Sequence, residues 1–501
     1  MNLPESSAGL PILSLLVFAP LLAAVVAGLM PGERSLKWWS LTATTAIALF
    51  SLTLLSGFEA TSSAFQYVEQ RQWIPALNMH YTLGIDGISL LLVLLTTLIM
   101  PFCVLASWTS IRIRLREFMI CLLVMQCAMT GVFVALDFVL FFIFWEAMLI
   151  PMALLIGIWG GAGRIYAALK FFIYTMAGSV LLIVAIIALR IELGTFSIPA
   201  LMDQPLERSF QLWVFAAFFI SFAIKVPMFP FHTWLPAAHV QAPTAGSVIL
   251  ASILLKMGTY GFLRFCLPIT PLAAIHFATA IQWLSVVAII YGGLTALAQS
   301  DLKKLVAYSS VAHMGFATLG IFSLVHTGTI GGALVMINHG VTTGALFIAV
   351  GIVYERLHTR DLSRSAGLGR QMPVLAFFLG IFCLSSMAFP GTNTFIGEFL
   401  VLGGAFEVSL WLALLAVPGV VIAAVYNLRM LQRVAYGGTS NPDHSSVARL
   451  HWREGLMLVP FVVFILWIGL QPEPFIHIMQ ASLENILDIL ERAHAATLLS
   501  P

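Results

Sequence analysis

The sequence has little charge. Charged residues make up 9% of its 501 residues, and hydrophobic residues make up 60%. An ordinary soluble domain carries about 25% charged residues, so this composition excludes one and is typical of a polytopic membrane protein. The net charge of +2 also gives no sign of the basic surface that binds nucleic acid.

Cysteine is scarce as well. The five cysteines form no CxxC pair and no cluster with metal-ligand spacing. We therefore expect neither an iron–sulfur cluster nor a structural zinc site on this chain. All five lie in apolar segments or at their ends, where cysteine is usually a small buried side chain.

Long hydrophobic runs divide the chain into candidate membrane spans. A spanning helix needs about 20 apolar residues, and on that basis we predict an all-α polytopic membrane protein with about 14 transmembrane helices. The first run has no basic flank and no evident cleavage site, so we interpret it as a span and not as a signal peptide. The predicted spans are 10–30, 37–57, 86–108, 117–135, 137–158, 168–190, 211–240, 244–267, 275–298, 304–325, 328–354, 373–405, 408–430 and 454–471.

The distribution of basic residues predicts the orientation of the chain. Most of the 24 lysines and arginines fall in segments at one end of the predicted spans. Basic residues accumulate in cytoplasmic loops, so we predict that both termini face outward.

Proline interrupts two of the predicted spans. Pro227, Pro230 and Pro236 lie in the first, and Pro390 followed by Gly391 lies in the second. An odd number of spans separates the two, so they would run in opposite directions across the membrane. Paired interrupted helices of this kind are typical of transporters built from inverted repeats. The alternative is two unrelated proline kinks, which are common in membrane helices.

The interruptions suggest a division of the chain into two inverted five-helix repeats, each with a broken helix. The predicted parts are residues 1–115 with the first three helices, 116–267 as the first repeat, 275–436 as the second repeat, and 450–501 with the last helix and an amphipathic tail. The tail has helical spacing of apolar residues, which predicts a helix on the outer surface or against a partner. Residues 59–84 are expected to form a short hairpin on the outer side.

Four full charges lie well inside apolar spans. They are Glu146, Lys225, Lys256 and Glu398. A charge in the middle of a membrane helix costs about 2.5 to 3.5 kcal/mol, so such residues are candidates for a functional site. A carboxylate and an ammonium buried together can exchange a proton or switch between paired and unpaired states. The alternative is a fixed ion pair that only sets helix packing, although buried pairs are poor stabilisers.

Histidines accompany these charges. His313 and His339 lie in the middle of spans, whereas His232 and His239 flank the first proline break. Histidine titrates near neutral pH and passes protons through either ring nitrogen, although any one of these could be an ordinary interior histidine. Tyr308 could hold bound water beside them.

The even spacing of His313, His326 and His339 also raises haem ligation. Bis-histidine ligation of stacked haems would need matching histidines on a facing helix. No second helix offers such a pair, and this interpretation is therefore disfavoured.

Six ordered motifs resemble a known family, the antiporter-like subunit M of bacterial NADH:quinone oxidoreductase, respiratory complex I, and its mitochondrial counterpart, NADH dehydrogenase subunit 4. The resemblance covers nearly the whole chain. The motifs are TLGIDGISL at 82–90, FWEAMLIPM at 144–152, KVPMFPFHTWLPAAHVQAPT at 225–244, LLKMGTYG at 254–261, QSDLKKLVAYSSVAHMGF at 299–316 and FPGTNTFIGEFL at 389–400.

The resemblance implies a proton-translocating membrane-arm subunit in the bacterial inner membrane. Electron transfer from NADH to quinone would occur in other subunits, which would hold the NADH, FMN, iron–sulfur clusters and quinone, and this chain would carry no cofactor and no metal. Its partners would be neighbouring antiporter-like subunits, the peripheral redox subunits and the lipid bilayer.

The resemblance also implies roles for individual residues. Lys225 would pair with Glu146, Lys256 would be the central lysine, and Glu398 would be the acid on the exit side. His313 and His339 would lie on the family's central hydrophilic axis. His232, His239 and Tyr308 are predicted as a possible auxiliary proton path from their residue types and positions alone.

The chain departs from the common pattern of the family, which more often has an acid at the position of Ala237 and frequently another polar or acidic residue at that of Gln241. This leaves the route of proton uptake open. Two other functions stay open as well. One is a subunit of a multi-chain sodium/proton antiporter or membrane-bound hydrogenase, and the other is a scaffold that does not pump.

Overall fold

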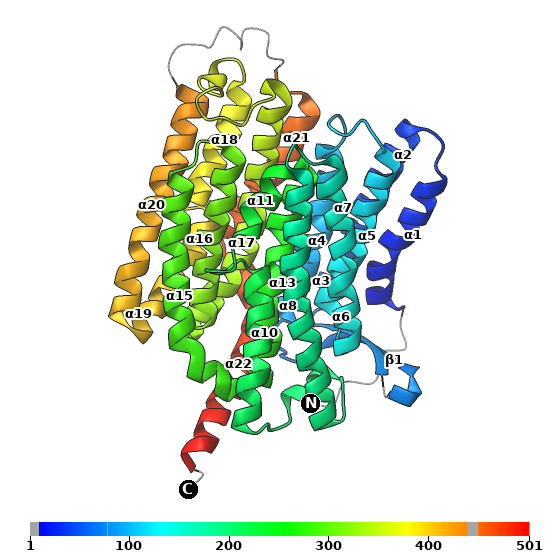
Figure 1. Cartoon of the computed structure of the whole chain (residues 1–501), viewed down its shortest axis with the longest axis vertical. Coiled ribbons are helices and arrows are strands. Elements are labelled where there is room, and N and C mark those ends of the chain that lie inside the picture. The colour runs from blue at the N-terminus through cyan, green and yellow to red at the C-terminus, as the bar shows by residue number, and fades with distance from the viewer. Residues whose placement is uncertain (1–9, 78, 438–448, 500–501) are drawn as a thin grey trace.

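The protein is a bundle of long helices that run in nearly the same direction or its reverse (Figure 1). The computed structural model describes residues 10–77, 79–437 and 449–499. In this part of the chain, 12 helices are long and apolar enough to cross a membrane. The predicted all-α polytopic fold is therefore confirmed.

The first part of the chain forms four long helices and a hairpin. The hairpin pairs its two strands antiparallel, as expected for residues 59–84. The elements are α1 (Ile12–Leu29), α2 (Glu33–Ser51), α3 (Thr53–Ser56), β1 (Gln66–Ile74), the short 3-10 turn η1 (Pro75–Leu77), β2 (Met79–Ile85), α4 (Gly87–Ala106) and α5 (Leu115–Val134).

The middle part contains the first proline break, between α10 and α11. Two π-helical turns, η2 and η3, interrupt the helix that carries Lys256. The elements are α6 (Phe138–Ala147), α7 (Leu149–Trp159), α8 (Arg164–Leu193), α9 (Ile198–Met202), α10 (Arg208–Lys225), α11 (Trp234–Gln241), α12 (Thr244–Ile249), η2 (Leu250–Leu254), α13 (Leu255–Gly261), η3 (Phe262–Cys266) and α14 (Leu267–Ile269).

The last part completes the bundle. The predicted spans 304–325 and 373–405 correspond to α16 and to the pair α18 and α19. The elements are α15 (Pro271–Leu297), α16 (Leu302–Ile321), α17 (His326–Leu357), the 3-10 turn η4 (Leu368–Arg370), α18 (Pro373–Ser386), α19 (Asn393–Val408), α20 (Leu410–Tyr436), α21 (Trp452–Leu470) and α22 (Glu473–Leu499).

The core of the bundle surrounds two helices. The stretch from α12 to α14 and the helix α17 are buried along their apolar lengths, whereas α1, α2 and α8 expose much of theirs. Exposed leucine, isoleucine and valine side chains on these outer helices form a surface suited to lipid. The two buried helices carry Lys256 and His339, so the core holds the polar residues that the sequence analysis selected.

Both predicted breaks are present, and they point in opposite directions. In Figure 1, α10 lies below α11, whereas α18 lies above α19. Polar side chains satisfy the backbone groups that the breaks release, as the membrane interior requires. At the first break, the indole nitrogen of Trp234 donates to the Ile224 carbonyl over 2.8 Å. At the second, Asn338 Nδ2 donates to the Asn393 carbonyl over 2.7 Å. The division into repeats stays a prediction.

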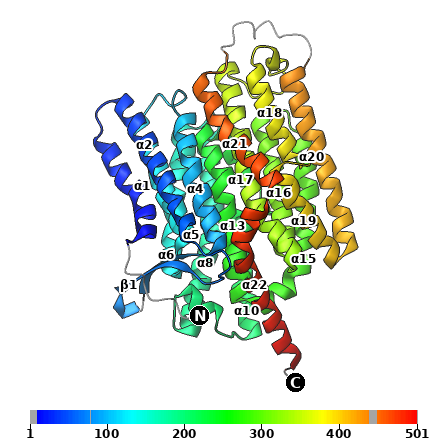
Figure 2. The ribbon, with the colours of Figure 1, turned by 180° about the vertical axis from the view of Figure 1, so that it is seen from behind.

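The C-terminal helix α22 crosses the bundle and packs on its own chain. It contacts α4, α15 and α17 and buries Met479, Leu483, Ile486 and Leu490 (Figure 2). The expected amphipathic helix is thus confirmed, but its apolar face covers this chain, which corrects the prediction of an outer surface or a partner.

Candidate functional site

Lys256 lies at the centre of the site. It is fully buried on α13, between the π-helical turns η2 and η3. A π-helical turn inserts a residue into the helix and is frequent at functional sites. The Lys256 ammonium donates to the Ala251 carbonyl over 2.5 Å and lies 2.5 Å from His339 Nδ1.

Two histidines continue from Lys256 toward the second break. The ring centroids of His339 on α17 and His313 on α16 are 5.9 Å apart. His313 Nδ1 lies 2.7 Å from Glu398 Oε1 on α19. The structure therefore joins four of the residues selected from the sequence into one buried row, Lys256–His339–His313–Glu398, which we call the central row.

A second group of polar side chains surrounds His313. Its Nε2 atom lies 3.3 Å from Ser386 Oγ at the end of α18 and 3.4 Å from the Tyr426 hydroxyl on α20. Asn427 donates to the same Ser386 oxygen over 3.2 Å. Tyr426 and Asn427 were missed in the sequence analysis, because a single tyrosine and asparagine in an apolar span carry no pattern.

The second break is built from hydroxyl and amide groups. The Asn393 side-chain oxygen accepts hydrogen bonds from Ser385 over 2.7 Å and from Thr342 over 3.2 Å. This cluster fixes the start of α19, which places Glu398 against His313 one turn further along. The acid is buried, with 1% of its surface exposed.

Lys225 ends α10 directly at the first break, and it is also buried. Its ammonium lies 4.9 Å from the centre of the Trp145 ring, within range of a cation–π interaction. Glu146, the next residue on α6, is partly exposed and acts on Lys225 through its charge. Among the described residues, however, no ion pair within 4.0 Å joins Lys225 to Glu146.

Gly258 brings the two lysine-bearing helices together. A Cβ atom at this position would lie 2.7 Å from the Phe222 carbonyl oxygen and 2.9 Å from the Val226 nitrogen. Only glycine allows so close an approach between backbones, and it sets α13 directly against the end of α10.

The auxiliary candidates lie toward the end of the bundle where α11 ends, which we call the basic face because the loops rich in arginine lie there. His239 stacks on Phe347 with ring centroids 4.6 Å apart. His232 packs against Tyr291 at 5.1 Å and lies 6.5 Å from Tyr308. Neither ring nitrogen of His239 has a hydrogen-bond partner among the described residues. Among the described residues, no hydrogen bond joins His232, His239 or Tyr308 to a member of the central row.

Lys303 lies beside His239 and is an addition from the structure. The sequence analysis counted it only among the basic residues that indicate orientation, but it is buried at 3% exposure. Its ammonium donates to the Ala242 carbonyl over 2.7 Å and to Ser247 Oγ over 3.2 Å. It lines a polar cavity of about 460 Å³ at the basic face together with Gln241 and Arg360.

A further buried ion pair lies near the opposite end of the bundle. Arg264 on η3 contacts Asp86 over 2.5 Å, and its Nε donates to the Tyr260 hydroxyl over 3.2 Å. The mutual charges hold the arginine and the carboxylate together in a dry setting. Asp86 also accepts a hydrogen bond from the Ser89 nitrogen and so caps α4.

The structure removes the basis for stacked haems. His326 is half exposed, and its Nε2 lies 3.0 Å from Glu484 on α22. His313 and His339 turn toward each other instead of lying at separate levels, and the even spacing in the sequence has no structural counterpart.

The fold and the buried charges define the class. A polytopic helical bundle with two oppositely directed broken helices and a row of buried ionisable groups is an antiporter-like membrane protein. Residues 135–423 match the family described as NADH:quinone oxidoreductase/Mrp antiporter, TM. Residues 17–131 match the amino terminus of NADH-ubiquinone oxidoreductase chain 4.

Individual proteins agree with both matches. NADH-quinone oxidoreductase subunit M of Rhodobacter capsulatus is 47% identical, covering 92% of this chain and 93% of its own. NADH-ubiquinone oxidoreductase chain 4 of Arabidopsis thaliana is 43% identical, covering 95% of this chain and 97% of its own. The chain therefore belongs to the family of NADH:quinone oxidoreductase subunit M and chain 4, and it is a subunit of an enzyme complex.

Solved structures extend the comparison. A chain of respiratory complex I from Thermus thermophilus has a TM-score of 0.88 and 31% identity, covering 95% of this chain and 99% of that one. A chain of an archaeal membrane-bound sulfane sulfur reductase has a TM-score of 0.84 at 22% identity and covers 93% of this chain and 77% of that one. At this identity the second likeness shows a shared fold.

Proposed function

We propose that the central row carries protons through this subunit of NADH:quinone oxidoreductase. The observation that supports it most is the close placement of four titratable groups. Lys256 lies 2.5 Å from His339 Nδ1, the His339 and His313 ring centroids are 5.9 Å apart, and His313 Nδ1 lies 2.7 Å from Glu398 Oε1. Lysine, histidine and carboxylate can each hold and release a proton, and the two imidazoles can pass one between their ring nitrogens. Lys256 is the central group, and Glu398 receives the proton on the exit side.

Lys225 and Glu146 act as the switch of this route. The charge of Glu146 acts on Lys225, but no direct ion pair joins them within 4.0 Å in the described structure, so a change in their separation decides whether they are paired. When Glu146 approaches, its charge holds a proton on Lys225. When it withdraws, the buried ammonium is uncompensated and the proton moves toward Lys256. The close packing at Gly258 places the two lysine-bearing helices side by side for this transfer.

Proton uptake begins at the polar cavity of the basic face. Lys303 lines this cavity, and His239 lies close enough to both Lys303 and Lys256 for their charges to act on it. His232 and Tyr308 form a second group of polar residues near the first break. Gln241 also lines the cavity, and its side-chain oxygen accepts from the Gly163 nitrogen over 3.1 Å. Since Ala237 and Gln241 supply no carboxylate, uptake in this chain runs through Lys303 and His239.

The setting follows from the family. The chain works with the other membrane-arm subunits and with the peripheral subunits, which hold the NADH, FMN, iron–sulfur clusters and quinone. It lies in a bacterial inner membrane with the basic face in the cytoplasm and both termini in the periplasm. Redox chemistry elsewhere drives the switch through charge.

The test is Glu146→Gln in the assembled complex. We expect NADH:quinone activity and proton pumping in reconstituted vesicles to fall together, because the switch loses its charge. Glu192→Gln, at an exposed glutamate near the end of α8, is the matched control and should pump normally. Full pumping by the Glu146→Gln complex would refute the assignment. Unchanged pumping by Lys256→Met, combined with poor assembly, would favour a scaffold.

A further inference from the structure

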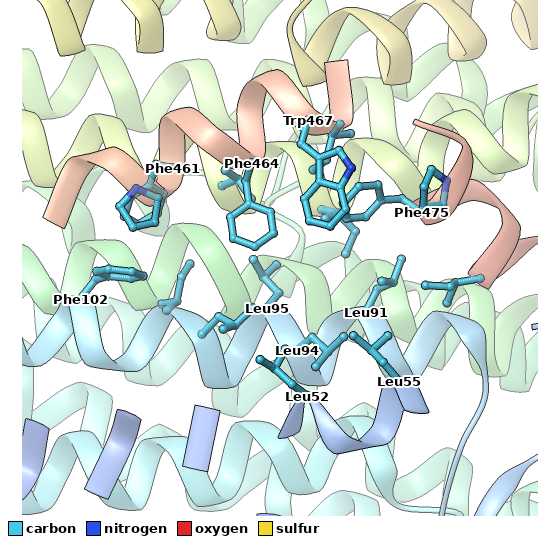
Figure 3. A pocket seen from close by; sticks show the side chains of 18 residues that line it. Leu52, Leu55, Leu91, Leu94, Leu95, Phe102, Phe461, Phe464, Trp467 and Phe475 are labelled. Carbon is cyan, nitrogen blue, oxygen red and sulfur yellow. The ribbon is translucent and has the colours of Figure 1, made fainter. Parts of the chain in front are cut away.

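An apolar groove lies between α4 on one side and α21 and α22 on the other, on the face shown in Figure 2. Leu52 directly after α2, Leu55 of α3, and Ile337 and Val341 of α17 also line it. Its volume is about 330 Å³, and leucines of α4 face aromatic side chains of α21 and α22 across it (Figure 3). We call it the α2–α21 groove. It is lined by Leu52, Leu55, Leu91, Leu94, Leu95, Leu98, Ile99, Phe102, Ile337, Val341, Pro460, Phe461, Phe464, Trp467, Ile468, Pro474, Phe475 and Ile478.

The groove is open at the surface of the bundle. Leu55 and Trp467 on its two sides are 44% and 46% exposed, while Leu95 at its base is 7% exposed. No titratable side chain lines it, so it plays no part in moving protons. An apolar groove at this depth suits a flexible hydrocarbon chain, because a void would lose the dispersion contacts of its lining.

Its two ends differ in chemistry. At the end away from the basic face, Pro474, Phe475 and Ile478 of α22 close it, and the nearest charged residue in the chain is the acidic Glu473. Toward the basic face, Trp38 lies on α2, Trp108 lies two residues after the end of α4, and Arg453 lies in the first turn of α21. The Trp38 and Trp108 rings are 5.2 Å apart, and the Arg453 guanidinium lies 5.7 Å from the Trp108 ring.

Arg453 is available to an anion. Within the described residues, no carboxylate lies within 4.0 Å of its guanidinium nitrogens, and the neighbouring Glu454 is bound by Arg356. Glu355 is the other carboxylate that faces it. Tryptophan and arginine at the end of a membrane helix are the residues that meet phospholipid headgroups.

The length fits one lipid. From Leu91 to Trp108 the chain advances about 25 Å at the helical rise of 1.5 Å per residue. One leaflet with its headgroups is about 20 to 22 Å deep. With the headgroup beside Arg453, the acyl chain therefore extends into the α2–α21 groove, and its methyl end lies toward the end that α22 closes.

From these observations we infer that the α2–α21 groove binds one acyl chain of an anionic phospholipid whose phosphate lies at Arg453. The lipid fills the space between α2 and α21 and joins the N-terminal helices to the rest of the bundle. Charge selects the leaflet at the basic face, because the Arg453 guanidinium lies toward that end of the groove.

The test uses the whole complex, washed in mild detergent, and native mass spectrometry with added phosphatidylglycerol or phosphatidylcholine. Leu98→Trp fills the groove and should lose the retained anionic lipid, whereas Leu466→Trp, at an exposed position of α21, should keep it. Arg453→Gln should bind phosphatidylglycerol about fivefold more weakly, since one basic contact near a lipid surface contributes about 1 kcal/mol.

Arg449→Gln is the matched control for the headgroup, because Arg449 is exposed four positions before Arg453. Equal retention in Leu98→Trp and wild type would overturn the inference. So would equal binding by the two arginine variants, equal affinity for the two lipids, or a retained molecule that proves to be quinone.

Discussion

At the scale of single residues, the central row depends on Glu398. The acid meets His313 at 2.7 Å, and its second oxygen has no partner among the described residues. Glu398→Gln keeps the shape but removes the charge and the proton-binding site. We expect an assembled complex whose proton pumping falls at least about tenfold, the effect of losing roughly 1.4 kcal/mol at a limiting transfer. Proton uptake into vesicles, followed with a pH-sensitive dye, measures this.

The same helix supplies the control for that variant. Glu407 lies on α19 as well but is exposed, so Glu407→Gln should leave pumping at the level of the wild type. If both variants pump normally, Glu398 is not on the route. If Glu398→Gln fails to assemble while Glu407→Gln assembles, the acid is a packing residue and the exit lies elsewhere.

At the scale of elements, the contact between α10 and α13 positions both buried lysines. A Cβ at Gly258 would lie within 2.9 Å of backbone atoms of α10. Backbone cannot give way as a flexible side chain can, so Gly258→Ala should destabilise the subunit by about 1 to 3 kcal/mol through overpacking. A lower temperature of thermal inactivation of the purified complex measures the loss.

Gly380→Ala on α18 is the matched change, because the nearest side-chain atom there is 4.0 Å from the added Cβ. Alanine favours a helix over glycine by about 1 kcal/mol, and this variant should be as stable as the wild type or more so. Equal stability of the Gly258→Ala and Gly380→Ala complexes would show that α10 and α13 can separate without cost.

At the scale of the whole molecule, α22 holds the two halves of the bundle together. It packs on α4 from the first part of the chain and on α15 and α17 from the last. At Gly87, the backbone nitrogen donates to Ser482 Oγ over 3.1 Å, and a Cβ there would lie 1.7 Å from the Ile478 carbonyl oxygen. The tail is therefore a structural strap across the end of the bundle.

Shortening one buried side chain tests this strap. Leu483 is fully buried, so Leu483→Ala should cost about 2 to 5 kcal/mol and make α22 more sensitive to limited proteolysis. Leu487, which is only partly buried, is the control and should tolerate alanine better. Equal protection of α22 in both variants would mean that the tail is held mainly by its hydrogen bonds or by partner subunits.

The sequence predicted much of this architecture because the membrane imposes strong rules. Hydrophobic length predicted the spans, and proline predicted the two breaks with their opposite directions. The cost of burying charge pointed to Lys256 and Glu398 without any structure. The same reasoning missed Tyr426 and Lys303, since neither stands out in its segment, and it placed the face of α22 wrongly because an amphipathic pattern does not name what covers it.

By itself, then, the sequence determined which residues lie at membrane depth and which of them are ionisable. The tertiary structure decided which of these meet. Four separate elements carry the central row, and their order is set by helix packing that brings Lys256 to His339 and His313 to Glu398. The same packing leaves Lys225 and Glu146 without a direct contact in the described chain. Proton transfer needs distances near that of a hydrogen bond, and such distances between residues far apart in sequence exist only in the folded chain.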